Sequence, residues 1–103
     1  MSELFKLVQR LHKANAFHIK RGRRILSYSV ADNSNHLLEE AVEVQAEVLA
    51  HPDSGCTSIR GTDKALEELG DTLGVLYHLM IRLGFSLDEV EAVTMKKYSE
   101  IFE

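Results

Sequence analysis

Apolar residues recur at helical spacing along most of the chain, and no stretch shows the strict alternation that is typical of a half-buried strand. The predicted helices cover residues 2–17, 34–50, 62–83 and 86 to almost 103, with residues 19–33 mostly in a loop. Their ends are predicted from capping residues and helix breakers, which are Ser2, Thr62, Ser86, Pro52 and Gly84. The expected fold class is therefore all-α.

The second and third predicted helices are apolar over most of their circumference. A chain of 103 residues buries only about 60–65% of the surface of its unfolded state, so one copy lacks the core to cover both helices. We expect a single domain over residues 1–103, built as a four-helix bundle that is completed by homodimerisation. Candidates for the dimer interface are apolar residues on the far sides of these helices: Val42, Leu49, Tyr77 and Ile81.

Acidic residues border the apolar faces of the same two helices. Glu40 and Glu43 are one turn apart on the second helix, and Glu68 and Asp71 are one turn apart on the third. If the helices pack antiparallel, the four carboxylates converge, and each pair at about 5 Å repels by about 3 kcal/mol at an effective dielectric of about 20. Several such pairs rival the stability of a small domain, so the sequence predicts a cation between the helices. The alternative is that these acids form the solvated faces of ordinary helices.

The residues available for a metal site are oxygen donors. Carboxylates alone favour Mg²⁺, with Mn²⁺ as a substitute. Cys56 is the one cysteine, so the chain forms neither an internal disulfide nor a thiolate cluster. The five histidines show no ligand spacing that pairs with the acids, and we assign them structural or surface roles. A di-iron centre would require Glu-x-x-His, which neither acidic pair provides.

Charge is distributed unevenly along the chain. Residues 1–28 hold seven Lys or Arg and one Glu, whereas residues 29–103 hold five Lys or Arg and fifteen acids. The two segments are expected to attract one another or to share a charged ligand. No apolar run is long enough to span a membrane and no export signal opens the sequence, so we expect a cytoplasmic protein without membrane contact.

The acidic motifs carry a family resemblance. Leu38-Glu-Glu-Ala-Val-Glu43 and Glu67-Glu-Leu-Gly-Asp71 resemble the Glu-x-x-Glu and Glu-x-x-Asp signature of the MazG-like all-α nucleoside triphosphate pyrophosphohydrolases, over roughly residues 36–102. The resemblance implies that Mg²⁺ is bound by Glu40, Glu43, Glu68 and Asp71. It also implies a homodimer that cleaves (deoxy)nucleoside triphosphates between the α and β phosphates, giving a monophosphate and pyrophosphate in nucleotide-pool house-cleaning.

The same resemblance suggests roles around the metal. Glu39 would orient or deprotonate the attacking water as the catalytic residue. Lys97 and Tyr98, on the last helix, stand where the family contacts phosphates, although Tyr98 and Ile101 replace its usual asparagine and arginine. A basic cluster that includes Arg23 and Arg24 would supply the missing positive charge; a solvated basic loop is the alternative.

Two other readings of the sequence stay open. The first is phosphoribosyl-ATP pyrophosphohydrolase, which shares the helical fold and the acidic motifs. The second is a non-catalytic helical dimer that binds nucleic acid or an acidic partner through its basic first segment. The negative net charge of −4 and the absence of a known DNA-binding motif argue against nucleic acid.

Overall fold

The computed structural model describes residues 2–14, 29–53, 55 and 59–102. Within these residues the chain is helical and contains no strand, so the expected all-α class is confirmed. The elements, in chain order, are α1 (Glu3–Lys13), α2 (Val30–Ala50), α3 (Asp63–Arg82), α4 (Leu87–Ser99) and the short 3-10 helix η3 (Glu100–Phe102). None of these helices is both long and apolar enough to cross a membrane.

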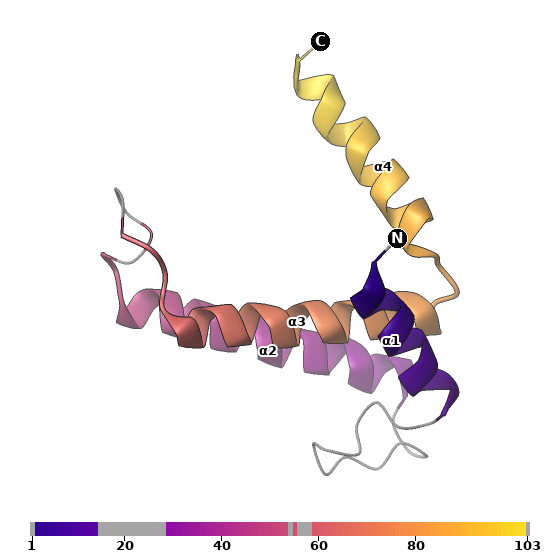
Figure 1. The fold of residues 1–103 in the computed structure, drawn as a ribbon, viewed down its shortest axis with the longest axis horizontal. Helices are drawn as coiled ribbons and strands as arrows, with labels where there is room; N and C mark the ends of the chain where they lie inside the picture. The colour runs from indigo at the N-terminus through magenta and orange to yellow at the C-terminus, as the bar shows by residue number, and fades with distance from the viewer. Residues whose placement is uncertain (1, 15–28, 54, 56–58, 103) are drawn as a thin grey trace.

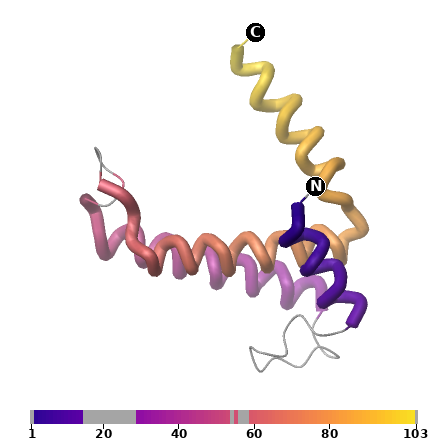
Figure 2. The backbone as a smooth tube through the Cα atoms, viewed as in Figure 1, coloured from indigo at the N-terminus to yellow at the C-terminus, as the bar shows by residue number. Residues whose placement is uncertain are grey.

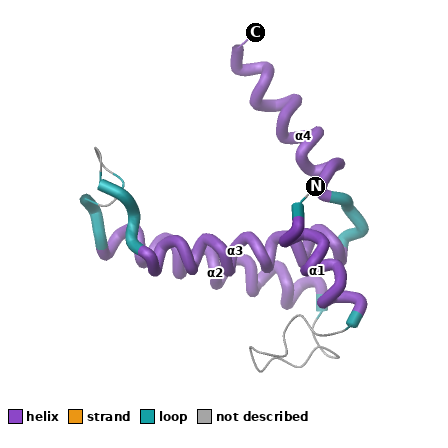
Figure 3. The backbone as a smooth tube through the Cα atoms, in the orientation of Figure 1, coloured by secondary structure: helices purple, strands orange, loops and turns teal. Residues whose placement is uncertain are grey.

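An antiparallel pair of helices forms the body of the molecule. α2 and α3 lie side by side over most of their length, and α1 crosses α3 near the end that leads to α4 (Figures 1 and 2). Figure 3 shows the loop that joins α2 to α3 at one end and the short turn into α4 at the other. α4 points away from the pair instead of packing along it. Within one copy, the four helices therefore do not close into a bundle.

The interior of this arrangement is small and partly polar. Its buried apolar residues, within the described part of the chain, are Phe5, Val8 and Val75. The Phe5 ring meets the edge of Tyr77 with 5.2 Å between ring centroids, which fixes α1 on α3. Four polar or charged residues are buried beside them: Asn33, His36, Glu40 and His78. The contact between α2 and α3 therefore depends on polar groups more than on a large apolar core.

The predicted helix ends are confirmed at most positions, but α1 ends at Lys13, with Ala14 as its C-cap, and not near residue 17. Thr62 caps α3 by accepting a hydrogen bond from the Ala65 amide at 3.0 Å, and Gly84 follows the helix with a φ of +83°. α2, however, begins at Val30 and not near residue 34, so the predicted loop is wrong from that residue on. The predictions for residues 15–28 lie outside the described residues.

A capping box explains the early start of α2. The Ser29 hydroxyl accepts a hydrogen bond from the Asp32 amide at 3.0 Å, and the Asp32 carboxylate accepts one from the Ser29 amide at 2.9 Å. Two amides that the first turn would leave without partners are satisfied in this way. This local chemistry starts the helix in a polar segment that has no apolar periodicity.

We predict that Ser29→Ala lowers the free energy of unfolding by about 1 kcal/mol, because it removes the cap. The matched control is Ser34→Ala on the same helix, where the hydroxyl donates only to the Ala31 carbonyl and alanine is the better helix former. Urea unfolding followed by circular dichroism measures both. Equal destabilisation by the two variants would contradict the capping role.

Candidate metal centre

Three of the four predicted metal ligands converge between α2 and α3. Carboxylate oxygens of Glu40, Glu68 and Asp71 lie within 4.8 Å of one another. Opposite ligands of one Mg²⁺ ion are about 4.2 Å apart, since each oxygen lies about 2.1 Å from the metal. The spacing therefore suits a single divalent cation with small side-chain adjustments. Glu40 is buried, Glu68 is half-buried and Asp71 is exposed, so the cluster opens from the helix contact towards solvent.

Glu43 is the fourth predicted ligand and lies at the edge of the cluster. Its side-chain hydrogen bonds with Glu68 and then Glu40 raise its pKa to about 7, and the negative charges of both neighbours and burial act in the same direction. A carboxyl group holds a proton near neutral pH when other carboxylates crowd it. The hydrogen bonds and the neighbouring negative charges both favour the protonated form of the Glu43 carboxyl.

The cluster contains a buried carboxylate oxygen without a hydrogen-bond partner among the described residues. Glu68 Oε2 is buried and accepts no hydrogen bond from the described part of the chain. A buried acceptor without a hydrogen bond lowers the free energy of unfolding by about 1–3 kcal/mol, and by more if the acceptor is charged. A divalent cation would satisfy this oxygen. This observation points to a ligand independently of the clustering itself.

His36, one turn before Glu40 on α2, forms a hydrogen bond with the Glu40 carboxylate. His36 Nε2 lies 3.0 Å from Glu40 Oε1, and both side chains are almost fully buried. The hydrogen bond fixes the orientation of the carboxylate, in the way that outer partners orient metal ligands. Sequence reasoning missed this role, although the signal was present: His36 precedes Glu40 by four residues, the spacing that places two helical side chains in contact.

An open pocket lies next to the acids. It has a volume of about 340 Å³ and is lined by Glu43, Ala46, Glu47, Lys64 and Glu68. The Glu47 carboxylate is already engaged, because it accepts a hydrogen bond from the Thr62 hydroxyl at 2.7 Å and lies 3.4 Å from His51 Nε2. Lys64 brings one positive charge to a lining that also holds three acidic residues. The sequence analysis did not identify this lysine.

The predicted site residues Glu39, Lys97 and Tyr98, which the structure describes, are not brought to the cluster within one copy. Glu39 is exposed on α2 and is not one of the three clustered acids. Lys97 and Tyr98 lie on α4, which extends away from the α2–α3 pair (Figure 1). Arg23 and Arg24 lie outside the described residues.

Comparisons of the chain with protein-family models, with curated proteins and with solved structures found no match. What the site can do must therefore be argued from its own residues. These residues offer a set of hard oxygen donors, an outer histidine and a neighbouring pocket with one lysine.

The raised pKa of Glu43 predicts a pH dependence of the metal-free protein. Glutamate in the unfolded chain titrates near about 4.3. The stabilising contribution of its proton is therefore fully present below that pH and is lost as the pH rises through about 7. We expect wild type to lose more stability between pH 5 and pH 8 than Glu43→Gln, whose amide mimics the protonated acid.

Urea unfolding in the presence of a chelator measures this difference at the two pH values. Parallel loss of stability in the two proteins would show that Glu43 does not carry the excess proton.

Proposed function

We propose that the chain binds Mg²⁺, or Mn²⁺ in its place, between α2 and α3. Glu40, Glu68 and Asp71 would hold the ion, and Glu43 would join them once the ion displaces its proton. The observation that carries this proposal is the convergence of three carboxylates within 4.8 Å, beside a fourth whose pKa is raised to about 7. The buried Oε2 of Glu68 supports it.

We further propose that the protein is a nucleotide pyrophosphohydrolase of the MazG-like type, as the acidic motifs suggest. Water would attack the α-phosphorus of a (deoxy)nucleoside triphosphate, and the bond from that phosphorus to the bridging oxygen would break, releasing a monophosphate and pyrophosphate. A bound Mg²⁺ supplies the charge that stabilises the phosphates in such a reaction. The pocket lined by Glu43, Lys64 and Glu68 lies next to the carboxylates, where phosphate groups must sit.

The chain's own groups have separate tasks in this proposal. Lys64 would contact a phosphate oxygen in the pocket, where its charge offsets that of the substrate. Glu39 would accept the proton of the attacking water if the bound substrate brings that water to its exposed side chain, which lies outside the three clustered acids. His36 would keep the Glu40 carboxylate in its place. Lys97 and Tyr98 would contribute to phosphate binding only from a second copy, because α4 leaves the body of its own copy.

We predict that Mg²⁺ raises the melting temperature of wild type and supports pyrophosphate release from at least one nucleoside triphosphate, because a ligand stabilises the state that binds it. Glu68→Gln should lose the thermal shift and at least 99% of the activity, on the order of the loss when a main electrostatic group is removed. A panel that includes phosphoribosyl-ATP separates the two substrate classes.

Glu67→Gln is the matched control. Glu67 is the preceding residue on α3, is exposed and carries the same charge, but it is not in the cluster. It should keep both the thermal shift and the activity. A wild type that releases pyrophosphate equally well in excess chelator would contradict the metal site.

We predict that His36→Leu weakens Mg²⁺ binding by about 10- to 100-fold, the usual cost of losing an outer partner of a metal ligand. His36→Gln should recover part of the affinity, because its amide can still donate to Glu40. Isothermal titration calorimetry measures the Mg²⁺ affinity of wild type and of the two folded variants. Equal affinity in wild type and His36→Leu would show that the hydrogen bond between His36 and Glu40 has no part in metal binding.

A further inference from the structure

Two histidines meet where α1 crosses α3. His12 Nδ1 lies 3.1 Å from His78 Nε2, and the ring centres are 5.2 Å apart, with 59° between the ring planes. His78 is buried, with 4% of its surface exposed, whereas His12 is exposed to solvent. We call these two residues the histidine pair. They are 66 positions apart in the chain, so the fold and not local helix spacing brings them together.

The packing of α1 on α3 holds His12 in this place. Phe5 and Val8 are the buried residues of α1, and His12 follows them at the spacing of three and four residues that keeps side chains on one face of a helix. The Phe5 ring contacts Tyr77, the residue next to His78 on α3. The apolar contacts of α1 therefore position its histidine over the histidine of α3.

A buried amide on α2 has no partner. Asn33 is 0% exposed, and neither its Oδ1 nor its Nδ2 has a hydrogen-bond partner among the described residues. Buried side-chain amides almost always make hydrogen bonds, to protein groups or to an ordered water. Asn33 therefore points to a polar ligand or water in the interior at this end of the helices.

The register of α2 against α3 places this amide opposite the histidine pair. Arg82 Nη1 donates a hydrogen bond to the Ser29 carbonyl at 3.1 Å, which fixes the level of the two helices at this end. About one turn further into the contact lie Asn33 on α2 and His78 on α3, both of them buried. The clustered acids follow two turns further along both helices, which confirms the register. The unpartnered amide and the buried imidazole therefore lie across the helix contact from each other.

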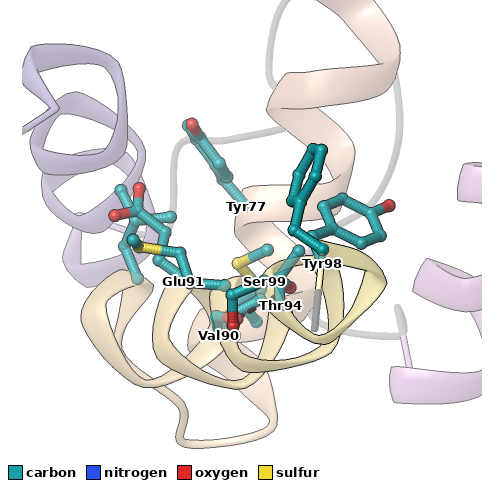
Figure 4. A pocket seen from close by; sticks show the side chains of 10 residues that line it. Tyr77, Val90, Glu91, Thr94, Tyr98 and Ser99 are labelled. Carbon is teal, nitrogen blue, oxygen red and sulfur yellow. Dashed lines mark hydrogen bonds between the residues drawn. The ribbon is translucent and has the colours of Figure 1, made fainter.

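The α4 side of α3 offers no comparable ligands. A groove of about 690 Å³ lies between the two helices, and its described lining is mostly apolar, with Tyr77 and Met80 from α3 (Figure 4). Glu91 is the one carboxylate among the described residues that line this groove, and none of them is a histidine. The imidazole donors at this end of the molecule therefore lie on the α1 side of α3.

We propose that the histidine pair binds a divalent transition-metal ion, Zn²⁺ in the first place, which joins α1 to α3. Imidazole nitrogen is a ligand that suits Zn²⁺, Ni²⁺ and Cu²⁺, whereas Mg²⁺ prefers oxygen. On one tetrahedral Zn²⁺ ion, two such nitrogens lie about 2.0–2.1 Å from the metal and so about 3.3–3.4 Å from each other. The 3.1 Å between His12 Nδ1 and His78 Nε2 requires only small side-chain adjustments.

Water would complete the coordination of this ion. Two imidazoles leave open positions, and the exposed side of His12 gives water access to them. The Asn33 amide, which carries both donors and an acceptor, would hold one such water through hydrogen bonds. This gives the buried amide the partner that it lacks among the described residues. In the metal-free protein, one nitrogen of the histidine pair donates a hydrogen bond to the other.

The bound ion would fasten α1 to the body of the molecule. The described part of the chain has three buried apolar residues, and two of them, Phe5 and Val8, belong to α1. A metal ion that binds the folded state and not the unfolded chain stabilises the fold. A protein with so small an apolar core gains from such a cross-link between helices.

Isothermal titration of Zn²⁺ into the full chain, without an affinity tag and in excess Mg²⁺, tests this site. The Mg²⁺ competes for the carboxylates between α2 and α3. Wild type should bind one Zn²⁺ ion per chain, and His12→Gln should weaken this binding more than tenfold, because it removes one of two protein ligands. His12 is exposed, so the variant should keep the fold, which circular dichroism checks.

His51→Gln is the matched control. His51 is an exposed histidine of α2's C-terminal end that also lies beside a side chain of another residue, Glu47, but it is not part of the histidine pair. This variant should keep the Zn²⁺ affinity of wild type. In wild type and in His51→Gln, Zn²⁺ should also slow hydrogen exchange of the α1 amides, because it holds α1 on α3; in His12→Gln it should not.

Three results would overturn the proposal: no Zn²⁺ binding to wild type, equal affinity in wild type and His12→Gln, or equal weakening by His12→Gln and His51→Gln. Each would leave the histidine pair as a hydrogen bond between two helices. Glu68→Gln, which removes a ligand of the proposed Mg²⁺ site, should bind Zn²⁺ as wild type does. The failure of one metal site is therefore distinguishable from the failure of the other.

Discussion

Repulsion between carboxylates on α2 and α3 is the constraint on which the rest of the account depends. The antiparallel pair brings Glu40, Glu68 and Asp71 within 4.8 Å of one another. Such a cluster persists only when its charge is offset, and hydrogen bonds with Glu68 and Glu40 raise the pKa of the neighbouring Glu43 to about 7. A divalent cation offsets more charge than a proton and satisfies the buried oxygen of Glu68 as well.

The acidic contact between α2 and α3 also explains why many apolar side chains are exposed to solvent. The contact between α2 and α3 is occupied by acids and by His36, so it has little room for a larger apolar core. Leucines and valines of the long helices are consequently exposed in one copy, and α4 leaves the body with its apolar residues bare. A polar centre and exposed apolar residues on the helices are thus two results of one choice of side chains at the helix contact.

Local features of the fold could be predicted from the sequence, and those set by distant contacts could not. Helical periodicity and most helix ends were predictable, because they depend on neighbouring residues. The convergence of three acids followed from their spacing once the two helices were assumed to be antiparallel. The start of α2 was missed because the Ser29 capping box lies in a segment without periodicity. The partnership of His36 with Glu40 required knowledge of burial, and the direction of α4 depends on surfaces far away in the sequence.

Titration of Mn²⁺ into the metal-free protein, followed by electron paramagnetic resonance of the free ion, tests the central claim most directly. If the fold holds the carboxylates together, Mn²⁺ binding is saturable in wild type and disappears in Asp71→Asn. We also expect Mn²⁺ binding to release more protons at pH 6 than at pH 8, because the raised pKa of Glu43 favours its protonated form at the lower pH. Weak binding that does not saturate, and that is the same in both proteins, would contradict a metal centre between α2 and α3.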